Sequence, residues 1–129
     1  MEKDFDKWNK RKIIINNGEQ LPFFNEKEIW FCSLGANVGF EQDGQGEDFQ
    51  RPVVIIKKFN NEIFWAIPLS KTKKQGKYYF AFPFNKQVMS VAILSQVKLM
   101  DAHRLSRKIG YMSKENYKNL TEKLKALLP

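Results

Sequence analysis

The chain has 129 residues and a formal net charge of +8, which leaves room for one domain with a single core. No apolar run approaches the roughly 20 residues that span a bilayer, and the charged segment Met1–Lys12 lacks the apolar stretch of a signal peptide. The lone cysteine, Cys32, excludes an internal disulfide and a cysteine-rich zinc site. These features predict a small, basic protein of the cytoplasm.

The first predicted element is a short helix over Asp4–Ile14. Asp4 is a suitable N-cap, acidic residues come early and basic residues late, and two aromatic side chains share one face. An Asn-Asn-Gly sequence then ends the helix. We therefore assign residues 1–27 to an N-terminal helical extension and residues 28–129 to the main domain.

About five short strands are predicted after this helix. They cover Glu28–Leu34, Val53–Lys58, Glu62–Leu69, Tyr78–Phe84 and Val88–Lys98. Asn60-Asn61 favours a tight turn, so the second and third strands are expected to pair as a hairpin. Pro83 indicates that the fourth strand lies at an edge of the sheet or ends early.

Two connections and a final helix complete the pattern. Gly35–Gln50 is a long acidic loop, and loops of this length in small domains are often functional. Asp101–Arg107 is predicted to form one helical turn. Ser113 is a suitable N-cap for a C-terminal helix, in which apolar residues from Tyr117 to Leu127 recur with 3-4-3 spacing. The prediction is a mainly β (β+α) fold, a small barrel closed by this helix.

The positive charge is concentrated in one stretch of the chain. Twelve Lys and Arg residues but only two acids, Glu62 and Asp101, fall between Phe49 and Ser113. A concentrated positive face attracts polyanions such as RNA. It is also compatible with an acidic protein partner or with a solvated lysine surface, and charge alone leaves these interpretations open.

Many catalytic arrangements are excluded by composition. With one His and one Cys there is no zinc cluster, and neither a P-loop nor a GxGxxG motif is present. Cys32 lies in an apolar strand, where a packing role is expected. His103 stands between Ala102 and Arg104 in a basic turn, where a surface residue is expected rather than a catalytic base.

Three short segments, in their order along the chain, are more informative. They are Leu34–Gln42 followed by Arg51–Ile56, then Ile67–Lys71, then Ser90–Asp101 with Arg104-Leu105 and Lys108–Gly110. Together with the terminal helix they resemble the MazF/PemK family of toxins of type II toxin–antitoxin systems, from about Glu28 to Leu128. The resemblance implies a Src-homology-3-like barrel (CcdB/MazF-like) with a C-terminal α-helix, to which this chain adds its N-terminal helix.

The resemblance also implies an activity. Family members are metal-independent endoribonucleases without a cofactor that cut single-stranded RNA at short sequences, usually as homodimers. A cognate acidic antitoxin inhibits them by crossing the RNA-binding groove. Such cleavage uses the neighbouring 2′-hydroxyl as nucleophile, so the site must stabilise charge on phosphorus and handle two proton transfers. We therefore expect a toxin with RNA, antitoxin and a second copy as partners, and no membrane.

The site residues follow from the same resemblance. Arg51 occupies the position of the family's catalytic Arg, and a guanidinium fork matches phosphate oxygens. Ser70 falls where the family usually has a Thr, and its hydroxyl suits the phosphate or the leaving oxygen, with Thr72 as the alternative if the loop register shifts. RNA contacts are expected at Phe40, Glu41, Gln42, Lys71, Thr72, Lys73, Lys74 and Gln96. The simpler interpretations are a strand-start Arg, a turn Ser and a solvated lysine loop.

A second function stays open, namely a non-enzymatic toxin or binding protein on the same barrel. CcdB-type toxins poison DNA gyrase through protein contacts, so the fold alone does not specify RNA cleavage. A degenerate member that only binds RNA or an antitoxin belongs to the same class. The joint presence of Arg51, Ser70 and Gln96 favours the enzyme.

Overall fold

The computed structural model describes residues 21–34 and 50–129. The strands of this part are β1 (Glu28–Ser33), β2 (Gln50–Lys58), β3 (Ile63–Ser70), β4 (Tyr79–Pro83), β5 (Met89–Ile93), β6 (Lys98–Asp101) and β7 (Leu105–Tyr111). Two 3₁₀ turns, η1 (Leu94–Gln96) and η2 (Ala102–Arg104), flank β6, and the helix α2 (Lys114–Lys125) follows β7. The predicted helix over Asp4–Ile14 lies outside the described residues.

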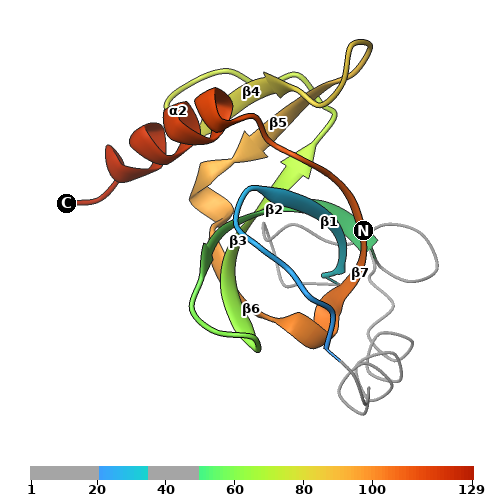
Figure 1. Cartoon of the computed structure of the whole chain (residues 1–129). Coiled ribbons are helices and arrows are strands. Elements are labelled where there is room, and N and C mark those ends of the chain that lie inside the picture. The colour runs from blue at the N-terminus through green and yellow to red at the C-terminus, as the bar shows by residue number, and fades with distance from the viewer. Residues whose placement is uncertain (1–20, 35–49) are drawn as a thin grey trace, which may run out of the picture.

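The strands roll into a barrel because β3 changes partner along its length. Its first half, Ile63–Ala66, pairs with β6, whereas Leu69 and Ser70 pair with β5. The order β6-β3-β2-β1-β7 forms the barrel wall, and η2 joins β6 directly to β7 (Figure 1). The β4–β5 hairpin therefore extends from the far end of β3, on the side of the barrel where β2 begins.

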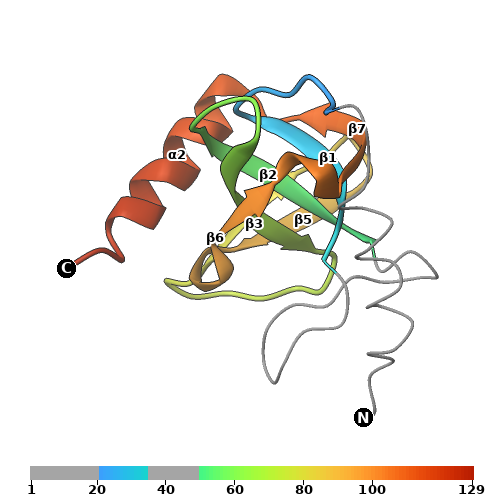
Figure 2. The same cartoon turned by 90° about the horizontal axis from the view of Figure 1, so that it is seen from below.

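Alternation along β2 divides the core into two clusters. Val53 and Ile55 belong to a cluster inside the barrel. Val54 and Ile56 point to the other face, in a second cluster that includes Leu120 of α2. Because both faces of β2 are buried, its centre is a continuous β-branched run rather than an apolar–polar alternation. The helix accordingly lies outside the barrel in both views (Figure 1, Figure 2).

The C-terminal helix begins where its sequence predicts. Ser113 Oγ accepts a hydrogen bond from the Asn116 backbone N–H at 3.1 Å, which satisfies a donor of the first turn. Leu120 is fully buried, and the Tyr117 hydroxyl donates to the Ile56 carbonyl oxygen at 2.5 Å. The apolar face of α2 is thus fixed on β2. No helix among the described residues has the length and apolar character needed to cross a membrane.

The mainly β fold is confirmed, but the described part of the chain already contains seven strands rather than the predicted five or so. The predicted strand Val88–Lys98 is wrong in extent, because η1 interrupts it and separates β5 from β6. The predicted turn Asp101–Arg107 is a three-residue 3₁₀ turn, after which Leu105 already begins β7. Only Leu105 is buried in β7, so that strand has no alternating pattern to detect. The expectation for Pro83 is confirmed, since it ends the edge strand β4.

Candidate functional site

A groove of about 900 Å³ lies where β2 begins and β3 ends. Its polar lining includes Gln50, Arg51, Ser70, Lys71, Thr72 and Lys74. Its apolar lining is formed by Phe31, Pro52, Leu69, Phe84, Val88 and Ile109. The groove therefore combines cations and hydroxyl groups on one part of its surface with an apolar wall on another.

Arg51 is positioned by the pairing of β2 with its neighbours. It lies opposite Cys32 of β1 in the register, and its side chain is half-buried. Its Nη1 atom donates a hydrogen bond to the Leu69 carbonyl oxygen at 3.2 Å. This bond holds the guanidinium at the groove wall, against the carbonyl group of the residue that precedes Ser70 in the chain. There its planar fork is suited to binding an oxyanion.

Both candidate hydroxyl groups lie in the turn that follows β3. Ser70 is the last residue of β3, and its Oγ accepts a hydrogen bond from the Thr72 backbone N–H at 3.1 Å. A hydroxyl that accepts one bond retains its own proton for donation. Thr72 is exposed and lines the same groove. Ser70 and Thr72 therefore line the same groove as Arg51.

The expected RNA-contacting residues divide into three groups. Lys71 and Lys74 line the groove, whereas Lys73 is exposed and lies outside its lining. Gln96 ends η1, is half-buried and also lies outside the groove lining. Phe40, Glu41 and Gln42 fall outside the described residues.

The basic loop between β3 and β4 is held from the helix side. Lys123 of α2 donates from Nζ to the carbonyl oxygens of Gly76 and Tyr79, at 3.0 and 2.5 Å. Lys74 Nζ lies 5.6 Å from the centre of the Tyr79 ring, within cation–π range. The C-terminal helix therefore anchors the loop that supplies two of the groove's cations.

Cys32 is the packing residue that the sequence predicts. It is fully buried inside the barrel, with its Sγ 3.8 Å from Met100 Sδ. Burial raises the pKa of its thiol to about 12, although the positive charge of Arg104 partly opposes this effect. A thiol in this state is protonated at neutral pH and cannot act as a nucleophile.

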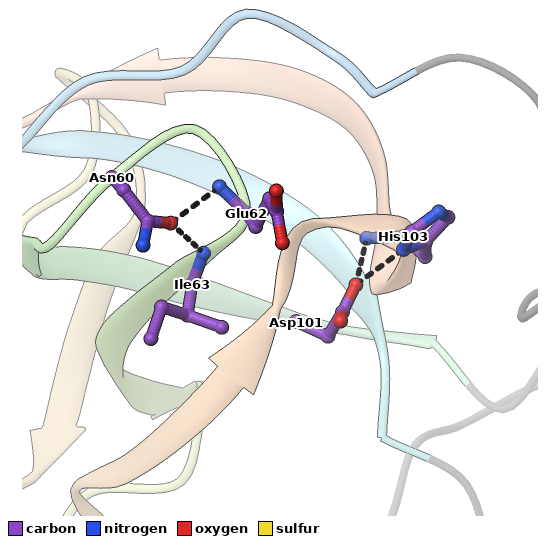
Figure 3. Close-up of polar contacts among 5 residues, drawn as sticks. All are labelled: Asn60, Glu62, Ile63, Asp101 and His103. Carbon is purple, nitrogen blue, oxygen red and sulfur yellow. Dashed lines mark hydrogen bonds and ion pairs between the residues drawn. The ribbon is translucent and has the colours of Figure 1, made fainter.

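His103 stabilises the turn between β6 and β7 (Figure 3). Asp101 Oδ1 accepts the His103 backbone N–H at 2.8 Å and contacts its ring Nδ1 at 2.5 Å. Burial alone would raise the pKa of Asp101, but the hydrogen bonds from His103 hold it below its ordinary value. Neither residue lines the groove. Within residues 21–34 and 50–129, no cluster of three or more His, Cys, Asp and Glu side chains is arranged to hold a metal ion.

The groove also contains residues that sequence reasoning missed. Phe31, Phe84, Ser90 and Ile109 come from β1, the β4–β5 hairpin and β7. Ser90 and Ile109 fall inside the segments that carry the family resemblance, but no spacing rule links the four residues to one site. Only the folding of the barrel and its hairpin brings them together.

Solved structures of other proteins share this fold. No curated protein sequence matches the chain. The Mycobacterium tuberculosis toxin MazF-mt6 superposes with a TM-score of 0.59 at 17% identity, covering 77% of this chain and 93% of that one. MazF from Deinococcus radiodurans gives 0.63 at 15% identity, covering 84% and 97%. A mycobacterial endoribonuclease in complex with its cognate antitoxin gives 0.62 at 12% identity, covering 83% and 98%. These similarities establish the shared fold.

The sequence itself identifies the family. The sequence model described as PemK-like, MazF-like toxin of type II toxin-antitoxin system matches residues 25–128. That span contains every described residue that lines the groove. The chain therefore belongs to the PemK-like, MazF-like family of toxins of type II toxin–antitoxin systems.

Proposed function

We propose that this chain is an endoribonuclease that cuts single-stranded RNA without a metal ion, by attack of a 2′-hydroxyl on the adjacent phosphate. The observation that carries the proposal is the meeting of Arg51, Ser70, Lys71 and Lys74 in one groove. Membership of the toxin family supports it, as does the endoribonuclease among the similar structures. The groove combines what such a reaction requires, namely cations for the RNA backbone and a fork of donors for the reacting phosphate.

Each residue has a role in this reaction. Lys71 and Lys74 attract the backbone phosphates, and Arg51 stabilises the charge that builds up on the pentavalent phosphorus. The bond from the 2′-oxygen to phosphorus forms while the bond to the 5′-oxygen breaks. The 2′-hydroxyl loses a proton, the 5′-oxygen gains one, and the Ser70 hydroxyl donates a hydrogen bond to the leaving or phosphate oxygen. The products are a 2′,3′-cyclic phosphate and a 5′-hydroxyl.

The test is digestion of a mixed pool of single-stranded RNA in the presence of a chelator. We expect cleavage at a short sequence, 2′,3′-cyclic phosphate ends, and a rate at least about 100-fold lower for Arg51→Ala. Arg51→Lys keeps the charge but loses the fork, so it should fall between the two. RNA that stays intact with and without chelator contradicts the proposal. Growth arrest that survives Arg51→Ala would instead indicate a non-enzymatic toxin.

We also propose two protein partners. An acidic antitoxin segment would inhibit the enzyme by occupying the cationic groove, because its carboxylates compete with RNA phosphates for Arg51, Lys71 and Lys74. A second copy of the chain completes the active toxin as a homodimer. Light scattering measures the dimer, and displacement of labelled RNA by the antitoxin measures competition. Antitoxin and RNA that bind together without competition would contradict the shared groove.

A further inference from the structure

The apolar wall of the groove has no role in the phosphate chemistry. Phe84 and Val88 come from the β4–β5 hairpin and Ile109 from β7, and all three are half-buried at the groove surface. An RNA backbone is polar and does not require such a wall. An unstacked nucleobase is suited to such a wall, because its two faces are flat, apolar and able to pack on an aromatic ring.

Phe84 is held at this wall by backbone hydrogen bonds and by packing against the second core cluster. Its backbone N–H donates to the Val88 carbonyl oxygen at 2.8 Å, and the Asn85 N–H shares that acceptor at 3.3 Å. The Phe84 ring lies against Gly110 of β7. Because packing already restricts the Phe84 ring, a base that stacks on it costs little further side-chain ordering.

Two polar groups lie beside the ring. Ser90 is only 7% exposed and lines the groove, yet its hydroxyl makes no hydrogen bond to any residue in the described ranges 21–34 and 50–129. A buried hydroxyl without a partner is costly, so it marks a place where a ligand supplies the partner. Ser90 pairs with Phe82 across β4 and β5, which puts it on the same face as Val88, two residues earlier.

The second polar group is the Asn85 amide. Its Oδ1 accepts the backbone N–H groups of Gln87 and Val88, at 2.9 and 3.0 Å, and these bonds fix the amide plane. The Nδ2 atom keeps two donors that the turn does not use. Donors of this kind suit the carbonyl oxygen or ring nitrogen at the edge of a base.

We propose that Phe84, Ser90 and Asn85 form a subsite for one unstacked base of the RNA strand whose phosphate lies at Arg51. The inference rests on the proposed function and adds a source of sequence preference to it. Phe84 packs on the face of the base, and the Ser90 hydroxyl with Asn85 Nδ2 bonds to its polar edge. The groove, at about 900 Å³, has room for this base together with its phosphate.

The test uses an RNA oligonucleotide that contains the cleavage site, with one 2′-deoxynucleotide that removes the attacking hydroxyl. A series of such oligonucleotides carries an abasic nucleotide at each position in turn. We expect one abasic position to weaken binding to the wild type about tenfold. Phe84→Leu should weaken binding of the intact oligonucleotide by a similar factor, with no further loss from that abasic nucleotide. Fluorescence anisotropy measures these affinities.

Two further variants sharpen the test. Phe59→Leu is the matched control, because Phe59 is 46% exposed beside Trp65 and lies outside the groove lining. It should bind every oligonucleotide as the wild type does. Ser90→Ala removes only a hydroxyl, so it keeps the fold even if Phe84→Leu does not. Sequencing of cleaved ends should show weaker base preference at one position for Ser90→Ala.

The outcomes separate the two levels of the proposal. A wild type that neither binds nor cleaves RNA refutes the proposed function and this subsite with it. A wild type that cleaves RNA, while Phe84→Leu and the abasic losses add independently at every position, overturns the subsite alone. If Phe84→Leu binds RNA as the wild type does but binds the antitoxin more weakly, the subsite is also overturned, because the apolar wall would then bind a peptide.

Discussion

The two halves of β3 show how one strand supports both structure and chemistry. Its first half, Ile63–Ala66, pairs with β6 and closes the barrel. Its end, at Leu69 and Ser70, pairs with β5 and opens onto the groove. Near the first half the polar side chains bond to their own turns: Asn60 Oδ1 accepts two backbone N–H groups, and Asp101 binds His103 (Figure 3). At the groove, hydroxyls and cations gather around a space large enough for a ligand.

The difference teaches where stability and function reside. Burial of apolar side chains stabilises the part of the barrel around Ile63–Ala66, which we call the closed half. The clustered cations at the groove, by contrast, repel one another in the absence of an anion. Substitutions in the closed half should therefore change the free energy of unfolding, but RNA binding and cleavage per folded molecule should stay unchanged. Substitutions at the groove should do the reverse.

The largest expected effect is on the closed half. Phe64 is fully buried and its ring centre lies 5.0 Å from that of Phe24. Phe64→Ala should lower the free energy of unfolding by about 3–5 kcal/mol, because it leaves a cavity inside the barrel. Urea denaturation measures the change. Phe59→Ala, at a residue 46% exposed, is the control and should cost much less. Equal losses in the two variants would remove the distinction between buried and exposed sites.

The next largest effect is at the end of β3. Ser70→Ala should reduce the rate of RNA cleavage about tenfold to a hundredfold, since a hydrogen bond to a charged group contributes about 1.5–3 kcal/mol. Its unfolding midpoint should stay close to the wild-type value. Ser70→Thr keeps the hydroxyl and should retain activity. If instead Thr72→Ala loses activity and Ser70→Ala does not, the functional hydroxyl belongs to Thr72.

A smaller effect is expected in the turn that closes the barrel. Asp101→Asn weakens the bonds to His103 and should cost about 1 kcal/mol at neutral pH, as for other side chains that cap a turn. Because the pKa of Asp101 is lowered by folding, its stabilising contribution is complete above its unfolded pKa of about 4 and is lost as the pH falls through the folded pKa. The stability difference between wild type and variant should therefore shrink in acid.

Denaturation at neutral and at strongly acidic pH checks this prediction. Asp101 is 51% exposed, so solvent screening keeps the effect modest. Glu62→Gln is the matched control, since Glu62 is exposed in the same region and its carboxylate accepts no hydrogen bond from residues 21–34 and 50–129. A difference between wild type and Asp101→Asn that is the same at both pH values would contradict the role of the ionised carboxylate.

The smallest effect concerns a single cation of the groove. Lys74→Gln should weaken RNA binding several-fold at low salt. It should also lower the number of counterions released on binding by about one, which makes the binding less dependent on salt. The measurement is the slope of the logarithm of the binding constant against the logarithm of salt concentration. Lys57 is exposed on β2 opposite Trp65, outside the groove lining, so Lys57→Gln is the control. Equal changes in slope would show that binding reflects overall charge and not the groove.

Several elements were predictable because local rules determine them. Alternation in Glu28–Ser33, the Asn60-Asn61 turn and the Ser113 cap each depend on neighbours within a few residues. The burial of Cys32 follows from its apolar strand in the same way. Strand β7 was missed because its exposed polar side chains leave no period to detect.

The sequence by itself therefore determined the main element types, the basic character and, through ordered motifs, the importance assigned to Arg51 and Ser70. Tertiary structure alone decided which residues meet. The register that pairs Val53 with Pro68 brings the beginning of β2 to the end of β3, and the β4–β5 hairpin then adds Phe84 and Ser90. Lys73, although adjacent to Lys74, lies outside the groove lining. Neighbours in a barrel are set by long-range strand pairing, which no local pattern of residues encodes.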